Sequence, residues 1–308
     1  MTKRDYLSVD DLSTEELTDL LGDAAAMKAK PEKHADALAG AHVALVFEKP
    51  STRTRVSMEV GVASLGGHPV VLRGDELQLG RGENIEDTGR VLSLYVDAIA
   101  VRTFGQERLE ALAAGATVPV INLLSDESHP CQALADLLTI QEHVNEKLSG
   151  TSLVYLGDGN NVAHSLLIAG ARMGMDVRVA SPSGYQPDRE VVERAREVAA
   201  HTRGRVIVTY LVAEAVEGAD VLYTDVWASM GQEGESGERI KVLEGYGIDE
   251  STVSMASDDV KVMHCLPAHR GEEISAEVMD GDRSIVWDQA ENRLHTQKAL
   301  LVWLLAQR

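Results

Sequence analysis

The sequence predicts an α/β fold of two domains, each built on a mostly parallel sheet flanked by helices. Short apolar runs rich in β-branched residues recur along the chain, and stretches with helical spacing lie between them. Strands that alternate with helices are typical of parallel sheets covered by helices on both faces. The length of 308 residues suits two domains of roughly 150 residues better than one compact core.

The expected strands are short, and several of them should be buried on both faces. They lie at residues 43–47, 152–157, 176–180, 205–208, 220–225, 261–266 and 284–287. Apolar residues at helical spacing mark residues 134–141 and 162–173 as helices, and Gly174 follows the second stretch where a helix C-cap is expected.

The domain boundary is expected at the polar segment 142–150, which ends in a glycine just before an expected strand. We therefore predict a first domain over residues 1–145 and a second over residues 150–289. Residues 290–308 are amphipathic and predict a helix that packs back on the first domain. Residues 231–250 are rich in Gly and Glu and predict either a mobile loop or a plain surface insertion.

Composition and charge exclude several classes of protein. The 49 acidic and 29 basic residues give a formal charge of -20, which repels nucleic acid and anionic lipid. No apolar run approaches the roughly 20 residues of a membrane span, and the N-terminal residues lack the apolar core of a secretory signal. The two cysteines, Cys131 and Cys265, lie far apart, so we expect a cytoplasmic protein with reduced thiols.

Lysine is scarce among the basic residues, with nine lysines against twenty arginines. A strongly acidic, lysine-poor surface keeps a protein hydrated where salt screens charge. We therefore hypothesise a salt-adapted, halophilic source. An ordinary acidic cytosolic protein is the alternative, because net charge informs on solubility and not on fold.

The first candidate site is the segment 47–55, where a strand leads through a proline turn into a hydroxyl-rich helix start. Free backbone N–H groups at a helix N-terminus, with neighbouring hydroxyls, can surround a phosphate. Arg53 adds a planar fork of donors. Arg55 lies about 200° further round the helix and should point elsewhere. A capped helix with a solvated arginine face is the alternative.

The second candidate is the helix start at residues 129–132. His129 and Gln132 are three residues apart and share one face of the first turn. A histidine there can donate a hydrogen bond to a carbonyl oxygen and stabilise negative charge on it. The alternatives are a purely structural cap and a zinc site with Cys131, but nothing nearby completes the three or four ligands that zinc needs.

The third candidate is the segment 157–161, between a strand and a helix. It resembles a dinucleotide-binding turn only superficially, because the third glycine is absent. Asn160 and Asn161 are instead polar groups at the carboxyl end of a strand, where ligands bind in open α/β sheets.

The fourth and fifth candidates are Asp225 and Cys265, each of which follows an apolar strand. Both should lie at the same edge of one sheet. A carboxylate there can hold and orient an ammonium group, and a nearby thiolate can accept its proton. A buried, inert cysteine is the alternative.

The order of these segments resembles one known family. The segments FEKPSTRTR, HPCQALAD, GDGNN, DVWASMG and HCLPAHRG together are similar to those of the ornithine carbamoyltransferases, nearly end to end. The S-T-R-T-R and H-P-x-Q elements are shared with aspartate carbamoyltransferases, whereas D-x-W-x-S-M-G and H-C-L-P mark the ornithine branch. The resemblance implies a homotrimer or an assembly of trimers, sites between subunits, and no metal or organic cofactor.

The resemblance also implies two sets of ligands and a catalytic set. Carbamoyl phosphate would be bound by Ser51, Thr52, Arg53, Thr54, Gln78, Arg102, His129, Gln132, Cys265, Leu266 and Arg293, with Gln78 reaching into the neighbouring subunit's site. Ornithine would be bound by Asn161, Asp225, Ser229 and Met230. The catalytic residues would be Arg53, Arg102, His129, Asp225 and Cys265.

The implied reaction joins carbamoyl phosphate and ornithine to give citrulline and phosphate, reversibly, in arginine synthesis or breakdown. The uncharged δ-amine attacks the carbamoyl carbon while arginine, threonine and histidine donors stabilise the oxyanion. The segment 231–250 would close over ornithine.

Rival functions stay open at this point. A transcarbamoylase acting on putrescine or acetylornithine would differ in few residues, whereas one acting on aspartate would lack H-C-L-P. A nicotinamide-dependent dehydrogenase would need the glycine turn that residues 157–161 do not supply. A non-catalytic binding protein on the same scaffold would not need to keep every catalytic group.

Overall fold

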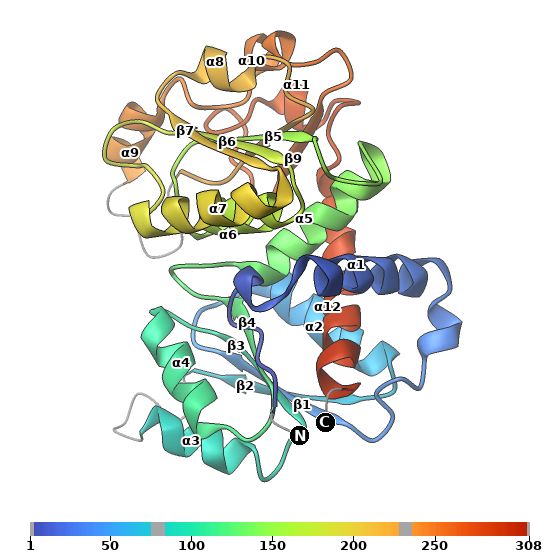
Figure 1. Ribbon diagram of the computed structural model, residues 1–308. Coiled ribbons are helices and arrows are strands. Elements are labelled where there is room, and N and C mark those ends of the chain that lie inside the picture. Colours follow the sequence, from blue (N-terminus) through green and yellow to red (C-terminus); the bar gives the residue numbers. More distant parts are fainter. Residues whose placement is uncertain (1–2, 75–83, 228–235, 307–308) are drawn as a thin grey trace. The chain divides into compact units, whose positions relative to one another are not determined.

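The computed structural model describes residues 3–74, 84–227 and 236–306 (Figure 1). The chain forms two compact units, one of Met1–Ala135 with Arg293–Arg308 and one of Asp136–Asn292. Each unit contains one sheet, and every strand pair in both sheets is parallel, which confirms the predicted fold class. No helix among the described residues is both long enough and apolar enough to cross a membrane.

The sheet of the first unit has the strand order β2-β1-β3-β4. Its strands are β1 (His42–Phe47), β2 (His68–Arg73), β3 (Ala98–Arg102) and β4 (Val120–Leu124). Only β1 was predicted. The pattern of β2 is half-buried and contains a proline, which weakens its strand signal. β3 and β4 are as short and as well buried as the strands predicted in the second unit, but they were not predicted.

Helices and short 3-10 turns surround this first sheet. They are η1 (Val9–Asp11), α1 (Thr14–Ala29), η2 (Pro31–His34), α2 (Thr52–Ser64), α3 (Ile85–Leu92) and α4 (Gln106–Gly115). The unit also includes the start of α5 (Pro130–His143) and most of α12 (Val286–Ala306). A Cβ on Gly61 of α2 would lie 3.5 Å from both Leu294 and Lys298, so the C-terminal helix packs on the first unit as predicted.

The sheet of the second unit has the order β7-β6-β5-β8-β9. Its strands are β5 (Ser152–Leu156), β6 (Asp176–Ala180), β7 (Arg205–Thr209), β8 (Val221–Thr224) and β9 (Lys261–His264), all of them predicted. Its helices are α6 (Asn161–Arg172), α7 (Arg189–Thr202), α8 (Val212–Val216), α9 (Ser236–Leu243), α10 (Glu250–Met255) and α11 (Ala276–Met279).

The strand predicted at 284–287 is wrong. Ser284 makes only an isolated bridge to Val262, and α12 begins at Val286. A short apolar run is compatible with a strand or with the buried start of a helix, and periodicity alone does not separate the two. The helix ending at Gly174 is confirmed: α6 ends at Arg172, and Gly174 has the left-handed φ of 72° that favours glycine.

The expected loop over residues 231–250 is wrong in part. Residues 231–235 lie outside the described residues, but α9 occupies residues 236–243. Arg239 and Leu243 are buried on one face of this helix. Tertiary contacts made by Arg239 therefore decide the conformation of a segment whose own periodicity is weak.

The strand orders locate the places where each sheet can bind a ligand. In the first unit β2 lies on one side of β1, and the chain then crosses back to place β3 on the other side of β1. In the second unit β6 and β7 follow on one side of β5, and the chain then crosses back to place β8 on the other side of β5. Ligands in open α/β sheets bind at such reversals, beyond the carboxyl ends of the strands. In this chain those ends carry the segment 47–55 and Arg102 in one unit, and Asn160 and Asp225 in the other.

The predicted domain boundary near residue 150 stays a prediction. The division into compact units falls inside α5, between Ala135 and Asp136, and inside α12, between Asn292 and Arg293. Both helices thus contribute residues to each unit.

Candidate active site

The first group of predicted ligands lies at the start of α2. Ser51 is the N-cap residue, its backbone is extended, and its hydroxyl makes no capping hydrogen bond. The first-turn N–H groups therefore have no side-chain acceptor in Ser51, and the positive end of the helix dipole adds to them. Thr52 and Arg53 are exposed, whereas Thr54 is buried. Such a helix start suits an anion.

Three guanidinium groups gather near this helix start. Arg102 ends β3 and is 7% exposed, and Arg293 of α12 donates to Thr54 Oγ1 at 2.7 Å. The pKa of Arg102 is lowered to about 10, first by burial and then by the charges of Arg293 and Arg53. Arg102 is still protonated at neutral pH, so the three arginines repel one another until an anion binds. Arg55 pairs instead with a glutamate one turn further along α2, as its offset predicted.

His129 lies directly before α5 and is 5% exposed. Burial lowers its pKa well below the usual range, and the charges of Arg293, Arg102 and Arg53 lower it further. The imidazole is therefore neutral at pH 7 and has one N–H to donate. Gln132, 1% exposed, lies in the first turn of α5 as predicted.

Cys131 is a buried thiol. Its Sγ donates to the backbone oxygen of Asn122 at 3.3 Å, and burial raises the pKa of the thiol to about 12. Among the described residues, Cys131 and His129 belong to neither of the two groups of side chains that lie close enough together to hold a metal ion.

The second group of predicted ligands lies beyond the ends of β5, β8 and β9 in the second unit. Asp225 accepts three hydrogen bonds: from Asn160 Nδ2 at 2.8 Å, from Cys265 Sγ at 2.9 Å and from the N–H of Val226 at 2.8 Å. The structure therefore brings Asp225 and Cys265 together, as their positions after two neighbouring strands predicted. Asn160 was expected only as a polar group at the strand end, and it also caps α6 by accepting from Val162 N at 2.9 Å.

The surroundings of Cys265 bear on the protonation of its thiol. The thiol donates to Asp225 Oδ1 at 2.9 Å. Burial raises its pKa well above the usual range, and the charge of Asp225 raises it further. Both causes favour the protonated thiol, so the thiolate that would accept a proton from the amine stays a prediction.

Of the remaining predicted ligands, two lie among the described residues and three do not. Asn161 is the first residue of α6. Leu266 directly follows Cys265 and has a left-handed φ of 63°. A branched side chain adopts that conformation at a cost in strain, and such strain is typical of ligand-binding loops. Gln78, Ser229 and Met230 lie outside the described residues.

An ion pair that the sequence did not reveal supports the end of β8. Arg239 of α9 pairs with Asp158, and its Nε donates to the backbone oxygen of Trp227 at 2.7 Å. The Arg239 guanidinium also lies over the Tyr185 ring, 4.9 Å from its centroid. Asp158 and Arg239 are 81 residues apart, so no local pattern could have predicted the pair.

A second hidden pair supports the loop that carries Cys265. His264 Nε2 lies 3.2 Å from Glu273, and its Nδ1 accepts from the N–H of Leu266 at 2.9 Å. Both side chains of the pair are fully buried. Asp225, His264 and Cys265 lie close enough together to suit a metal ion. However, both ring nitrogens of His264 are engaged, so the ring serves here to hold the loop.

The two groups of residues therefore have opposite chemistry. The first unit offers arginines, a neutral histidine and a helix N-terminus, which suit a phosphorylated anion. The second offers Asp225 with amide and thiol neighbours, which suits an ammonium group. Together these features fit an enzyme that transfers a group from a phosphorylated donor to an amine.

Comparison with known proteins gives the family. Residues 4–142 match the aspartate/ornithine carbamoyltransferase carbamoyl-P binding domain, and residues 149–304 match the Asp/Orn binding domain. The chain belongs to the aspartate/ornithine carbamoyltransferase family.

Its relatives are similar over nearly their whole length. An ornithine carbamoyltransferase of Parafrankia sp. is 59% identical, covering 99% of this chain and 97% of the relative. One of Acidothermus cellulolyticus is 57% identical, covering 98% and 96%. The solved structure of the ornithine carbamoyltransferase from Pyrococcus furiosus is 52% identical with a TM-score of 0.94, covering 97% of this chain and 96% of that one.

Proposed function

We propose that this protein transfers the carbamoyl group of carbamoyl phosphate to the δ-amine of ornithine, giving citrulline and phosphate. The observation that carries the proposal is the separation of charge between the two units, with three arginines at one sheet reversal and Asp225 at the other. A phosphorylated donor and an amine acceptor need opposite electrostatic environments. Relatives more than half identical to this chain are named for the ornithine reaction.

The anion half of the site would stabilise the charge that develops on the carbamoyl oxygen. Arg53 and Arg102 supply positive charge, and His129 supplies an N–H while it is neutral. Donors that are fixed before the reaction need no reorganisation when the oxyanion forms. Ser51, Thr52 and Thr54 with the α2 backbone, and Gln132 and Arg293, would hold the phosphate and the rest of the carbamoyl group.

The amine half of the site would hold the acceptor and remove its proton. An alkylammonium like that of lysine has a pKa near 10.4, so free ornithine must lose a proton before it attacks. Burial and then the charge of Asp225 raise the pKa of the Cys265 thiol, and an ammonium on Asp225 would offset the second of these causes. The thiol proton would pass to the Asp225 carboxylate, to which it already donates, and the thiolate would then accept the proton of the amine. Asn161, Ser229 and Met230 would hold the other end of ornithine.

Carbamoyl transfer to putrescine or acetylornithine is the rival proposal. Both acceptors would use the same anion half, and the acceptor residues Ser229 and Met230 lie outside the described residues. The names of relatives more than half identical to this chain favour ornithine.

Assembly, location and salt preference complete the proposal. The resemblance of the motifs supports a homotrimer or an assembly of trimers with Gln78 reaching a neighbour's site, in the cytoplasm. The formal charge of -20 supports salt adaptation. Light scattering after size exclusion, at low and at multimolar salt, tests both the assembly and its salt dependence.

The test of the function is citrulline formation measured in parallel with ornithine, aspartate, putrescine and acetylornithine as acceptors. Product from ornithine alone, lost in Arg53→Ala, is the expected result. Arg55→Ala is the matched control, since its side chain is exposed and paired elsewhere on the same helix. Carbamoylation of another acceptor without activity on ornithine would overturn the assignment.

A further inference from the structure

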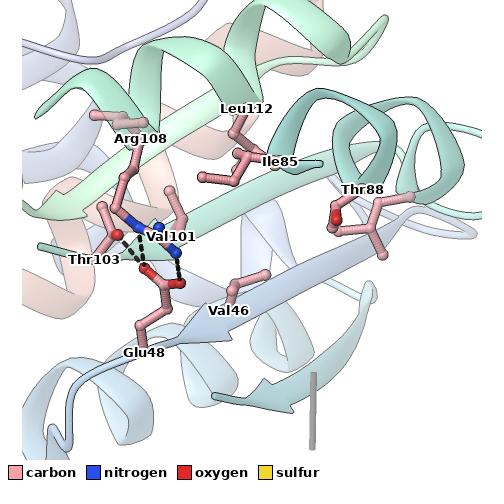
Figure 2. Close-up of a pocket in the computed structure, with 10 residues that line it drawn as sticks. Val46, Glu48, Ile85, Thr88, Val101, Thr103, Arg108 and Leu112 are labelled. Atoms are coloured by element: carbon pink, nitrogen blue, oxygen red, sulfur yellow. Dashed lines mark hydrogen bonds and ion pairs between the residues drawn. The ribbon is translucent and has the colours of Figure 1, made fainter. Parts of the chain in front are cut away.

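The side chain of Glu48 joins three parts of the first unit. Glu48 follows β1 directly and precedes the N-cap of α2 by three residues. Its carboxylate accepts from Arg108 Nη2 at 2.5 Å and also from the hydroxyl of Thr103, as Figure 2 shows. Its own N–H donates to the backbone oxygen of Arg102 at 2.9 Å. One residue therefore connects the start of α2, the end of β3 and α4.

The surroundings of this group are largely dry. The Glu48 side chain is 10% exposed, and the apolar side chains of Val46, Val101, Leu109 and Leu112 line the pocket around it (Figure 2). In such surroundings a charge is costly without a partner and strongly felt by other charges.

The position of Arg108 is unfavourable on local grounds. It is the third residue of α4, in the first helical turn, where the positive end of the helix dipole repels a cation. The N-cap of this helix, Gly105, has no side chain, and Glu107 is the acidic residue of the same turn. Glu48 compensates Arg108, and Arg108 compensates Glu48.

Lys49 is engaged elsewhere, although it is the next residue along the chain. It forms an ion pair with Asp126 and lies 4.4 Å from the centroid of the Phe104 ring. Arg108 is thus the cation that directly contacts the Glu48 carboxylate.

We propose that Glu48 and Arg108 are positioning residues of the anion site, with Arg108 also masking a carboxylate that would otherwise repel carbamoyl phosphate. The pair holds the turn before α2 against the end of β3. Arg102 is the last residue of that strand. This inference rests on the proposed function, because the anion it concerns is the phosphorylated donor.

Positioning of the anion site and masking of the Glu48 charge can be told apart, because they predict different effects for Glu48→Gln and Arg108→Gln. If the pair serves geometry alone, Glu48→Gln and Arg108→Gln break the same contact and weaken anion binding equally. If Arg108 also masks charge, Arg108→Gln leaves an unpaired carboxylate three residues before the N-cap of α2 and is the worse variant. The double variant removes that carboxylate and recovers binding.

The experiment compares wild type, both single variants and the double variant by initial rates and by calorimetric titration with inorganic phosphate. Arg108→Gln is expected to raise the KM for carbamoyl phosphate and the Kd for phosphate about tenfold to thirtyfold, and Glu48→Gln about threefold to fivefold. The double variant should return to within about fivefold of wild type. The KM for ornithine should stay within about twofold, because Asp225 is untouched.

Arg90→Gln is the matched control, since Arg90 pairs with Asp87 at 2.6 Å on the exposed face of α3. It should leave every constant unchanged. Equal defects in the two single variants, a double variant as weak as Arg108→Gln, or changes in unfolding temperature alone would overturn the inference. If wild type binds phosphate but makes no citrulline, the proposed function fails while the phosphate constants still decide this inference. If wild type does not bind phosphate, both fail.

Discussion

The two sheets differ in the charged groups that lie where their strand order reverses. In the first unit burial lowers the pKa of Arg102 to about 10, and repulsion from the charges of Arg293 and Arg53 contributes to the shift. In the second unit Asp225 is already satisfied by an amide, a thiol and a backbone N–H. The anion site is therefore strained before its ligand arrives, whereas the amine site is preorganised around one carboxylate. Binding an anion relieves repulsion in one, and binding an amine replaces hydrogen bonds in the other.

The largest effect should follow removal of the carboxylate charge at Asp225. Asp225→Asn should lower kcat/KM for ornithine by about a thousandfold or more, because a buried ammonium without a counter-charge is costly. The KM for carbamoyl phosphate should stay within about threefold. An equal loss for both substrates would show that the two sites are not separable.

A loss of about a hundredfold in kcat is expected for Arg102→Gln, because the proposed mechanism makes Arg102 a donor to the developing oxyanion. The same change should raise the pKa of His129, because one of the charges that lower it is gone. In the proposed mechanism neutral His129 is the active form, and it exists above its pKa. The acid limb of the kcat/KM profile for carbamoyl phosphate should therefore move to higher pH, and an unmoved limb would contradict the role given to His129.

Cys265 should react slowly with iodoacetamide, since its raised pKa leaves little thiolate at neutral pH. Asp225→Asn should speed alkylation about tenfold, because it removes the second cause of the raised pKa, the carboxylate, while burial, the first cause, stays. The site of modification is read by peptide mass spectrometry. Rapid alkylation of wild type, with no change in the variant, would instead indicate that Cys265 is a thiolate.

The smallest effect concerns two helix caps. Asn160→Ala should lower the free energy of unfolding by about 1–2 kcal/mol, and so should Asp188→Ala at the N-cap of α7, whose side chain accepts from Glu190 N. Only Asn160→Ala should also raise the KM for ornithine, about tenfold, since Asn160 bonds Asp225. Equal KM values for ornithine in the two variants would show that Asn160 acts only as a helix cap.

The sequence predicted features that depend on local pattern. The buried strands of the second unit have continuous apolar runs, and Gly174 marks a helix end, so both could be read along the chain. The meeting of Asp225 and Cys265 was also predictable, because residues after neighbouring parallel strands share a sheet edge.

Features that depend on distant pairs were not predictable. The strands β2, β3 and β4 are defined by their partners more than by their own period. Asp158 with Arg239, His264 with Glu273, and Glu48 with Arg108 carry no signal in one sequence, since each pair is made by folding. The protonation of Cys265 likewise depends on its distance from Asp225, which only the structure gives.

The most direct test of the central claim is a grid of initial rates over both substrates for wild type, Arg53→Ala and Asp225→Asn, with citrulline as the product measured. The account predicts turnover with ornithine in wild type, a loss in Arg53→Ala that appears against carbamoyl phosphate, and a loss in Asp225→Asn that appears against ornithine. Citrulline formed by Asp225→Asn at the wild-type rate would contradict the account.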